Sequence, residues 1–175
     1  FNGGRGAGTI IKSLMRFKNI KITSIINTLD DGKSTGEIRN IFNMFGPSDL
    51  RKVQYLYLEK NNLFYEENKI IFEYRLNVNN SLEVIYELND FISKKNKINI
   101  FDLNIKDKKK IKSFKNYILL FLKHLNKNSS ANTNIGKWSF MNIVYAGCYL
   151  KNSKNILKTI NEVKKLFNIK HDVYP

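Results

Sequence analysis

Two short stretches of this chain hold the residue types that phosphate chemistry needs. Residues 1–9 carry glycines at positions 3, 4, 6 and 8, and residues 27–36 place two aspartates ahead of a Ser-Thr-Gly sequence. Glycine turns let backbone N–H groups approach an anion, and the start of a following helix favours negative charge there. Adjacent carboxylates can coordinate Mg²⁺ or accept hydrogen bonds from a ribose. Together the two stretches predict a nucleotide-binding crevice.

Each stretch alone also has a plainer interpretation. The glycine spacing matches neither the dinucleotide fingerprint nor the phosphate loop of common ATPases, so a tight turn would explain it. Asp31 and Gly32 can form a turn followed by a helix cap at Ser34 or Thr35. Asp49 at a helix start is commonly a partner of the helix dipole, whereas Arg51 could clamp a phosphate. Trp138 could stack on a base or be buried.

The elements around these stretches predict an α/β fold. Helical spacing over 8–18 precedes a β-branched run over 20–26, which is typical of a buried parallel strand, and 170–175 predicts another strand. Open α/β sheets bind ligands at the carboxyl edge of their strands. We therefore expect a Rossmann-like, doubly wound parallel sheet with helices on both faces.

Five further helices are predicted to start at Pro47, Ser81, Ser113, Asn142 and Ser153. The polar, lysine-rich segment 93–112 is interpreted as an insertion that holds a short strand or a mobile loop. Residues 1–175 are long enough for a single domain with a substantial core. Both ends cut into predicted strands, so we expect the N-terminal part of a larger domain.

Charge and composition narrow the class of protein. The net charge is +15, but lysine is frequent along the whole chain, as are asparagine and isoleucine. This even distribution favours solvated lysines over a polyanion-binding site, and we expect the same of the dense cluster 106–112. No apolar run approaches the roughly 20 residues of a membrane span, so we expect no membrane role. The single cysteine, Cys148, excludes an internal disulfide and fits a reducing compartment, the cytoplasm. His124 and His171 lie outside the motifs.

The motifs in this order resemble the CofD/YvcK-like family, which comprises the 2-phospho-L-lactate transferases and the related gluconeogenesis-factor proteins. The resemblance rests on Gly3-Gly4-x-Gly6, on Asp30-Asp31-Gly32-x-Ser34-Thr35-Gly36-x-x-Arg39 and on Gly46-Pro47-Ser48-Asp49-x-Arg51, with weaker matches at Phe72-Glu73-Tyr74-Arg75 and at Asn142-Ile143-x-x-Ala146-Gly147. The middle signature is closer to the gluconeogenesis-factor branch. Two features depart from the family: Arg5 stands where relatives have Thr or His, and residues 137–142 lack the usual Gly-His pattern.

This resemblance implies a nucleotide or nucleotide-sugar at the carboxyl edge of the sheet, with Mg²⁺. The leading hypothesis for the function is transfer of a phosphorylated group from a nucleoside-diphosphate donor, as in the transferases. The alternative hypothesis is a non-catalytic regulator that binds UDP-sugars. A polyanion-binding module is the weaker alternative. The implied ligand-binding residues are Gly3, Gly4, Arg5, Gly6, Thr9, Asn27, Asp30, Ser34, Thr35, Gly36, Arg51 and Asn142, with Asp30 and Asp31 as metal ligands and Asp31 and Asp49 as catalytic groups. We expect neither nucleic acid nor membrane as a partner, and a second copy or the remainder of a longer chain could complete the site.

Overall fold

The computed structural model describes residues 7–29, 33–60, 62–78, 80–93, 99–100, 103–128 and 138–175. The elements follow in the order α1 (Ala7–Leu14), β1 (Thr23–Ile25), α2 (Lys33–Phe42), α3 (Pro47–Leu56), α4 (Tyr65–Glu73), α5 (Ser81–Ser93), β2 (Asn99–Ile100), β3 (Leu103–Asn104), α6 (Lys108–Asn128), α7 (Phe140–Lys151), α8 (Ile156–Leu166) and β4 (Asp172–Tyr174). Among these residues no helix combines the length and the apolar composition needed to cross a bilayer.

The predicted parallel sheet is present. β1 and β4 pair in parallel with Ser24 opposite Val173, and both strands are shorter than the runs that predicted them. Their pairing continues at each end, where Asp172 N donates to Ile22 O and Ile26 N donates to Tyr174 O, both at 2.9 Å. β2 and β3 form a separate antiparallel pair inside the lysine-rich segment. The α/β class is therefore confirmed.

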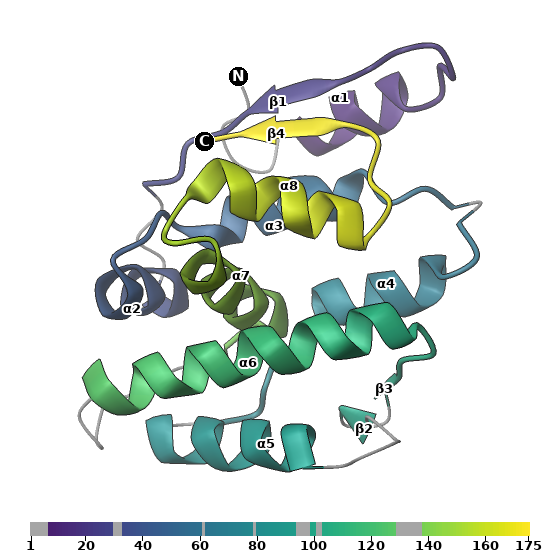
Figure 1. The fold of residues 1–175 in the computed structure, drawn as a ribbon. Helices are drawn as coiled ribbons and strands as arrows, with labels where there is room; N and C mark the ends of the chain where they lie inside the picture. Colours follow the sequence, from purple (N-terminus) through teal and green to yellow (C-terminus); the bar gives the residue numbers. More distant parts are fainter. Residues whose placement is uncertain are drawn as a thin grey trace.

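The helices lie in layers beneath this parallel sheet (Figure 1). α3 and α8 pack against β4, α7 packs beneath them, and α6 covers the far side of α7, followed by α5. The residues of α7 from Phe140 to Tyr149 are all buried, because α2, α3, α4, α6 and α8 contact it. α7 is thus the centre of the core.

A glycine lets α6 and α7 approach each other closely. A Cβ atom on Gly147 would lie 2.0 Å from the carbonyl oxygen of Tyr117, far inside any normal contact. On the facing side of α6, Phe114, Phe121 and Leu125 are buried as the three-four rhythm of the sequence predicted. The absence of a side chain at Gly147 therefore sets the distance between α6 and α7.

α6 begins one and a half turns earlier than predicted. Its first residue is Lys108, not Ser113. The cap is Asp107, whose side-chain Oδ1 accepts hydrogen bonds from Lys109 N at 2.9 Å and from Lys110 N at 3.3 Å. The apolar rhythm that signalled this helix starts only at Phe114, so the sequence pattern did not reveal the first turn.

α3 and α5 begin at Pro47 and Ser81 as predicted, whereas the starts of α7 and α8 differ from the prediction by two or three residues. α7 begins at Phe140, which places Asn142 inside the first turn and not at its opening. α8 begins at Ile156 and not at Ser153, because the side chain of Asn155 accepts a hydrogen bond from Lys158 N at 2.9 Å.

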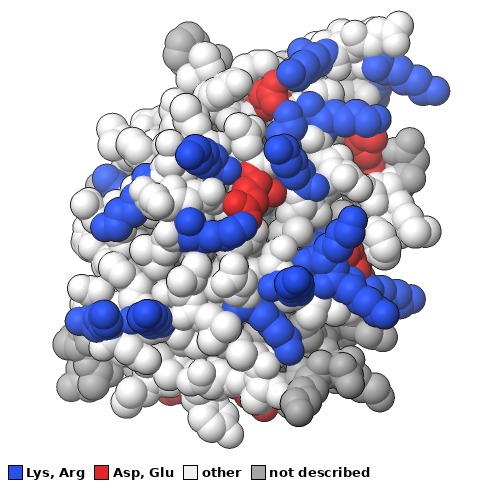
Figure 2. Space-filling model, viewed as in Figure 1, with Lys and Arg blue, Asp and Glu red and all other residues white. Residues whose placement is uncertain are grey.

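Lys110 contradicts the expectation that the 106–112 cluster is wholly solvated. Its side chain is 2% exposed, with Nζ 3.5 Å from carboxylate oxygens of both Glu67 and Asp107. The same Nζ lies 4.7 Å from the centre of the Phe64 ring. The remaining lysines of α6 are exposed or half-buried, and basic side chains are scattered over the face seen in Figure 2.

Both histidines have backbone partners, in keeping with their place outside the motifs. The Nδ1 atom of His171 accepts a hydrogen bond from Ile22 N at 3.2 Å, and burial lowers the pKa of His171 despite the opposing charge of Glu59. His124 Nε2 lies 2.9 Å from the carbonyl oxygen of Ile41, to which it donates.

Candidate functional site

The first turns of three helices meet through polar side chains. The hydroxyl of Thr35 in α2 is hydrogen-bonded to the hydroxyl of Ser48 in α3. From α7, Asn142 Nδ2 donates to the same Ser48 Oγ at 3.4 Å. All three residues are buried. We call Thr35, Ser48 and Asn142 the helix-start cluster.

Two of these helices begin without a side-chain cap. Gly46 precedes Pro47 at the start of α3, and Ser139 precedes α7, and neither residue makes a capping hydrogen bond through a side chain. At α3 the uncapped first turn leaves backbone N–H groups and the positive end of the helix dipole available to an anion. At α7, Phe140 N already donates to Tyr74 O at 3.1 Å and Asn142 N donates to Ser139 O at 3.0 Å. Convergence of helix starts therefore creates a region that favours negative charge.

Buried polar atoms at this place lack partners within the described part of the chain. They are Ser139 Oγ and Asn142 Oδ1, on residues that are 0% and 1% exposed. Buried polar atoms are almost always hydrogen-bonded, so an orphan of this kind calls for a specific explanation. A bound ligand with hydrogen-bonding groups would supply the missing partners.

The loop after β1 is held next to the start of α3. Asn27 Oδ1 accepts a hydrogen bond from Leu29 N at 2.9 Å, which closes a local turn. Arg39 Nη1 donates to Leu29 O at 3.2 Å, and Gly46 N donates to Thr28 O at 3.0 Å. This loop leads directly into the two aspartates of the acidic turn, which α2 then follows.

Many of the predicted site residues lie outside the described residues: Gly3, Gly4, Arg5, Gly6, Asp30, Asp31 and the side chain of Ser34. Thr9 is exposed in the first turn of α1, and Gly36 is half-buried in α2. The structure thus brings Thr35 and Asn142 together, whereas the glycine turn and the acidic pair stay predictions.

Asp49 and Arg51 face different surroundings although both belong to α3. Asp49 accepts a hydrogen bond from Lys52 Nζ at 2.8 Å within the first turns of the helix. Arg51 is buried and donates from Nη1 to the carbonyl oxygen of Phe72 at 2.8 Å, at the end of α4. Burial lowers the pKa of the Arg51 guanidinium, and the charge of Arg75 lowers it further. Arg51 therefore already holds a backbone group of α4.

Trp138 follows the burial alternative. It is 0% exposed, and its Nε1 donates to Glu37 Oε2 at 3.4 Å. Burial raises the pKa of Glu37, while the hydrogen bond from Trp138 lowers it.

The sequence had singled out neither Ser48 nor Ser139 as a ligand-binding residue. For Ser48 the available signal was its place after Pro47 at a helix start.

Two observations concern nucleophiles and metal ligands among the described residues. Burial raises the pKa of Cys148 to about 12, so its thiol stays protonated and is no nucleophile. Within the described ranges no group of three or more His, Cys, Asp or Glu side chains could hold a metal ion. Mg²⁺ usually binds through one or two carboxylates plus phosphate oxygens, so Asp30 and Asp31 together with a ligand would suffice for it.

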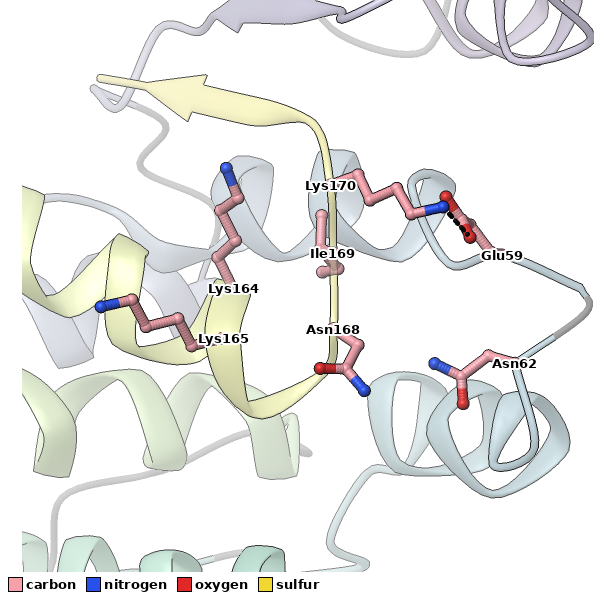
Figure 3. A pocket seen from close by; sticks show the side chains of 7 residues that line it. All are labelled: Glu59, Asn62, Lys164, Lys165, Asn168, Ile169 and Lys170. Atoms are coloured by element: carbon pink, nitrogen blue, oxygen red, sulfur yellow. Dashed lines mark ion pairs between the residues drawn. The ribbon is translucent and has the colours of Figure 1, made fainter. Parts of the chain in front are cut away.

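A hollow of about 590 Å³ lies elsewhere, at the amino end of β4 (Figure 3). It is lined by Glu59, Asn62, Lys164, Lys165, Asn168, Ile169 and Lys170. Lys170 pairs with Glu59 at 3.1 Å, and Lys164 pairs with Asp172. Its charges are thus largely satisfied, and it lies at the opposite end of the strands from the loop after β1.

Comparisons with known proteins give a family and a fold. Residues 1–175 match the family described as "2-phospho-L-lactate transferase CofD". A gluconeogenesis-factor homologue of Streptococcus pyogenes is 41% identical over 75 residues, which are 43% of this chain and 22% of that protein. The gluconeogenesis factor of Listeria monocytogenes is 41% identical over 51 residues, which are 29% of this chain and 16% of that protein.

The crystal structure of a UPF0052-family member from Bacillus halodurans has the same fold. It superposes with a TM-score of 0.54 at 20% identity and covers 100% of this chain and 37% of that one. The chain therefore spans little more than a third of this structural relative, and its matches span about a fifth of the curated relatives.

Proposed function

We propose that this chain, which belongs to the 2-phospho-L-lactate transferase CofD family, binds the phosphates of a nucleotide at the helix-start cluster and transfers a phosphorylated group from a nucleoside-diphosphate donor. The observation that carries the proposal is the meeting of three helix starts through Thr35, Ser48 and Asn142. Helix starts attract phosphate through their N–H groups and dipoles.

The hydrogen-bonding groups at the helix-start cluster suit two different parts of a nucleotide. Backbone N–H groups of α3 and the Ser139 hydroxyl can donate to phosphate oxygens. Asn142 Oδ1 can only accept, so it suits a ribose hydroxyl or an N–H group of the base. We therefore place the phosphates over the helix starts and the nucleoside beside Asn142.

The reacting groups would come from the acidic residues. Transfer forms a bond between an acceptor oxygen and phosphorus and breaks the bond to the nucleoside phosphate, which leaves with its electron pair. Asp31 and Asp49 are our candidates to take the proton of the acceptor hydroxyl. Mg²⁺ held by Asp30 and Asp31 would neutralise phosphate charge.

A regulatory UDP-sugar-binding function is the second candidate. The gluconeogenesis-factor relatives at about 40% identity favour it, because their matches are local but clear. The same helix-start cluster would then bind the diphosphate of the UDP-sugar, and the acidic pair would not act as a base.

A pair of valine substitutions tests the site. Thr35→Val removes the hydroxyl that meets Ser48, while Thr159→Val removes an equally buried hydroxyl that donates to Asn155 O at 2.8 Å within α8. Thermal shift and calorimetric titration would use GDP, GTP, UDP-glucose and NAD, with and without Mg²⁺. We expect Thr35→Val to weaken nucleotide binding by about two- to tenfold, since it removes a hydrogen bond to Ser48 and a neutral hydrogen bond contributes about 0.5–1.5 kcal/mol.

Two outcomes separate the candidates. Turnover of a nucleoside-diphosphate donor with release of the nucleoside phosphate supports the transferase, whereas a thermal shift with UDP-glucose and no turnover supports the regulator. Equal nucleotide affinity in the Thr35→Val and Thr159→Val variants would sink the assignment of the site itself.

A further inference from the structure

The positive charge of this protein is concentrated in its C-terminal part. Residues 1–107 contain sixteen Lys and Arg against thirteen Asp and Glu, a net charge of +3. Residues 108–175 contain fourteen Lys against two acidic residues, a net charge of +12. The lysine excess is thus not an even compositional background, which corrects the interpretation from overall composition.

α6 carries the densest part of this charge. Its 21 residues include seven lysines and no acidic residue. Lys108, Lys112, Lys123 and Lys127 are exposed. Their spacings of four, eleven and four residues are close to whole helical turns, which places them on one side of the helix. Within the described ranges Lys112, Lys123 and Lys127 have no carboxylate partner.

The charge continues from α6 onto α8. The exposed lysines here are Lys151, Lys154, Lys158 and Lys165. The acidic residue of α8, Glu162, is bound by Lys151 and by Tyr117 of α6, which also ties the two helices together. Figure 2 shows basic side chains spread across this face, with few acidic ones among them. We call the exposed lysines of α6, α8 and the end of α7 the lysine face.

We propose that the lysine face binds the phosphate backbone of a duplex nucleic acid, as an activity separate from the nucleotide site. Clustered lysines neutralise phosphates and release their counterions, which drives sequence-independent binding. Arg75 is the last arginine of the chain, so the face offers point charges and lacks the bidentate forks that read guanine.

The rest of α6 favours a duplex over other polyanions. Its aromatic residues Phe114, Tyr117 and Phe121 are buried, so they are not available to stack on the bases of a single strand. A helix that lies on a membrane must insert its apolar side into the bilayer, but the apolar side of α6 is packed against α7. The exposed side chains of α6 are lysines and asparagines together with Leu119, and the phosphates of a duplex match the lysine charges.

The length of the lysine row suits a duplex. Lys108 and Lys127 are nineteen residues apart, which corresponds to about 28 Å along a helix. At about 3.4 Å per step, this row would span about eight base pairs. Several phosphates could therefore be contacted at the same time.

The test measures how binding depends on salt. Fluorescence anisotropy of a 20-base-pair duplex would be recorded between about 0.05 and 0.3 M salt for the full chain and for the triple variant Lys112→Gln, Lys123→Gln, Lys127→Gln. Since the slope of log K against log salt is about −0.9 per neutralised phosphate, we expect it to become shallower by about three in the triple variant. Affinity at 0.15 M salt should fall by about two orders of magnitude by the same relation.

The matched control removes three exposed cations elsewhere. Lys12→Gln, Arg16→Gln and Lys18→Gln change α1 and the turn after it, away from α6 in Figure 1. The control should bind the duplex like the parent chain. An unchanged slope in the α6 variant, or equal losses in both variants, overturns the proposal. So does tighter binding to a single strand or to vesicles of phosphatidylcholine and phosphatidylserine than to the duplex.

Discussion

Replacement of Gly147 by alanine tests the central packing of the fold and the site together. The new Cβ would lie 2.0 Å from Tyr117 O, 2.5 Å from its carbonyl carbon and 2.8 Å from its Cα. All three atoms are backbone atoms of α6, so no side-chain rotation can relieve the clash. α6 and α7 would have to move apart by about 1 Å to reach an ordinary contact.

Two opposing effects set the magnitude. Overpacking of a well-packed core costs about 1–3 kcal/mol, and a gap of 0.5–1 Å forfeits a quarter to a half of each van der Waals contact across the interface. Alanine gains about 1 kcal/mol over glycine in a helix interior. Because the clash involves backbone on both sides, we expect a net loss of about 2 kcal/mol or more in the free energy of unfolding.

The same displacement should reach the candidate site. Asn142 lies on α7, five residues before Gly147, and its bond to Ser48 is already 3.4 Å long. A shift of α7 by about 1 Å would break this bond. Nucleotide binding by the folded variant should therefore weaken as well.

Gly8→Ala is the matched control, because its Cβ would meet only Leu56 Cδ1 at 3.8 Å, an ordinary contact. Urea unfolding followed by circular dichroism would compare both variants with the parent chain. Gly8→Ala should change stability by less than about 1 kcal/mol. A Gly147→Ala variant as stable as the Gly8→Ala variant would refute the reasoning about the α6–α7 contact.

Two further predictions concern buried charge. Lys110→Ala should lower the free energy of unfolding by about 3 kcal/mol, because it leaves the Glu67 carboxylate, which is 12% exposed, without its ion-pair partner. The control is Lys109→Ala, which changes an exposed lysine and should cost less than about 0.5 kcal/mol in the same urea experiment. Similar small losses in both would show that the buried pair is neutral. Because burial lowers the pKa of His171 below 6.5, the free energy of unfolding should be highest above that pH and fall towards pH 5. His171→Gln should remove this dependence of stability on pH, and His124→Gln should not. A slope that persists in His171→Gln would contradict this assignment.

The sequence predicted those helices that have one apolar side. The three-four rhythm of α6 gave its buried residues correctly, but its first turn depends on Lys110, which is buried through a partner 43 positions away in the sequence. No local pattern can report such a contact. α7 is buried on all sides, so its sequence has no alternation of apolar and polar residues that could mark its start at Phe140. For Tyr65–Glu73 the sequence predicted no helix, because its apolar residues are consecutive and not periodic.

Of the helix-start cluster the sequence singled out Thr35 and Asn142, but neither Ser48 nor the contacts among the three residues. The sequence predicted that a helix starts at Asn142, and this was wrong by two residues because α7 begins at Phe140. Thr35 and Ser48 bond to each other across two helices, and the sequence offers no pairing signal for a serine and a threonine thirteen residues apart. The motif order singled out the segments in which α2, α3 and α7 begin, whereas the meeting of these helices is a property of tertiary packing.

This meeting has an electrostatic consequence for ligand binding. Each helix start carries about half a positive elementary charge, so three of them in one place repel one another unless negative charge is brought in. Asp49 supplies some of it but is already paired with Lys52. Asp30 and Asp31 precede α2 directly and can supply more. A diphosphate would offset the repulsion most completely, and its binding should therefore stabilise the relative placement of α2, α3 and α7 as well as the ligand itself.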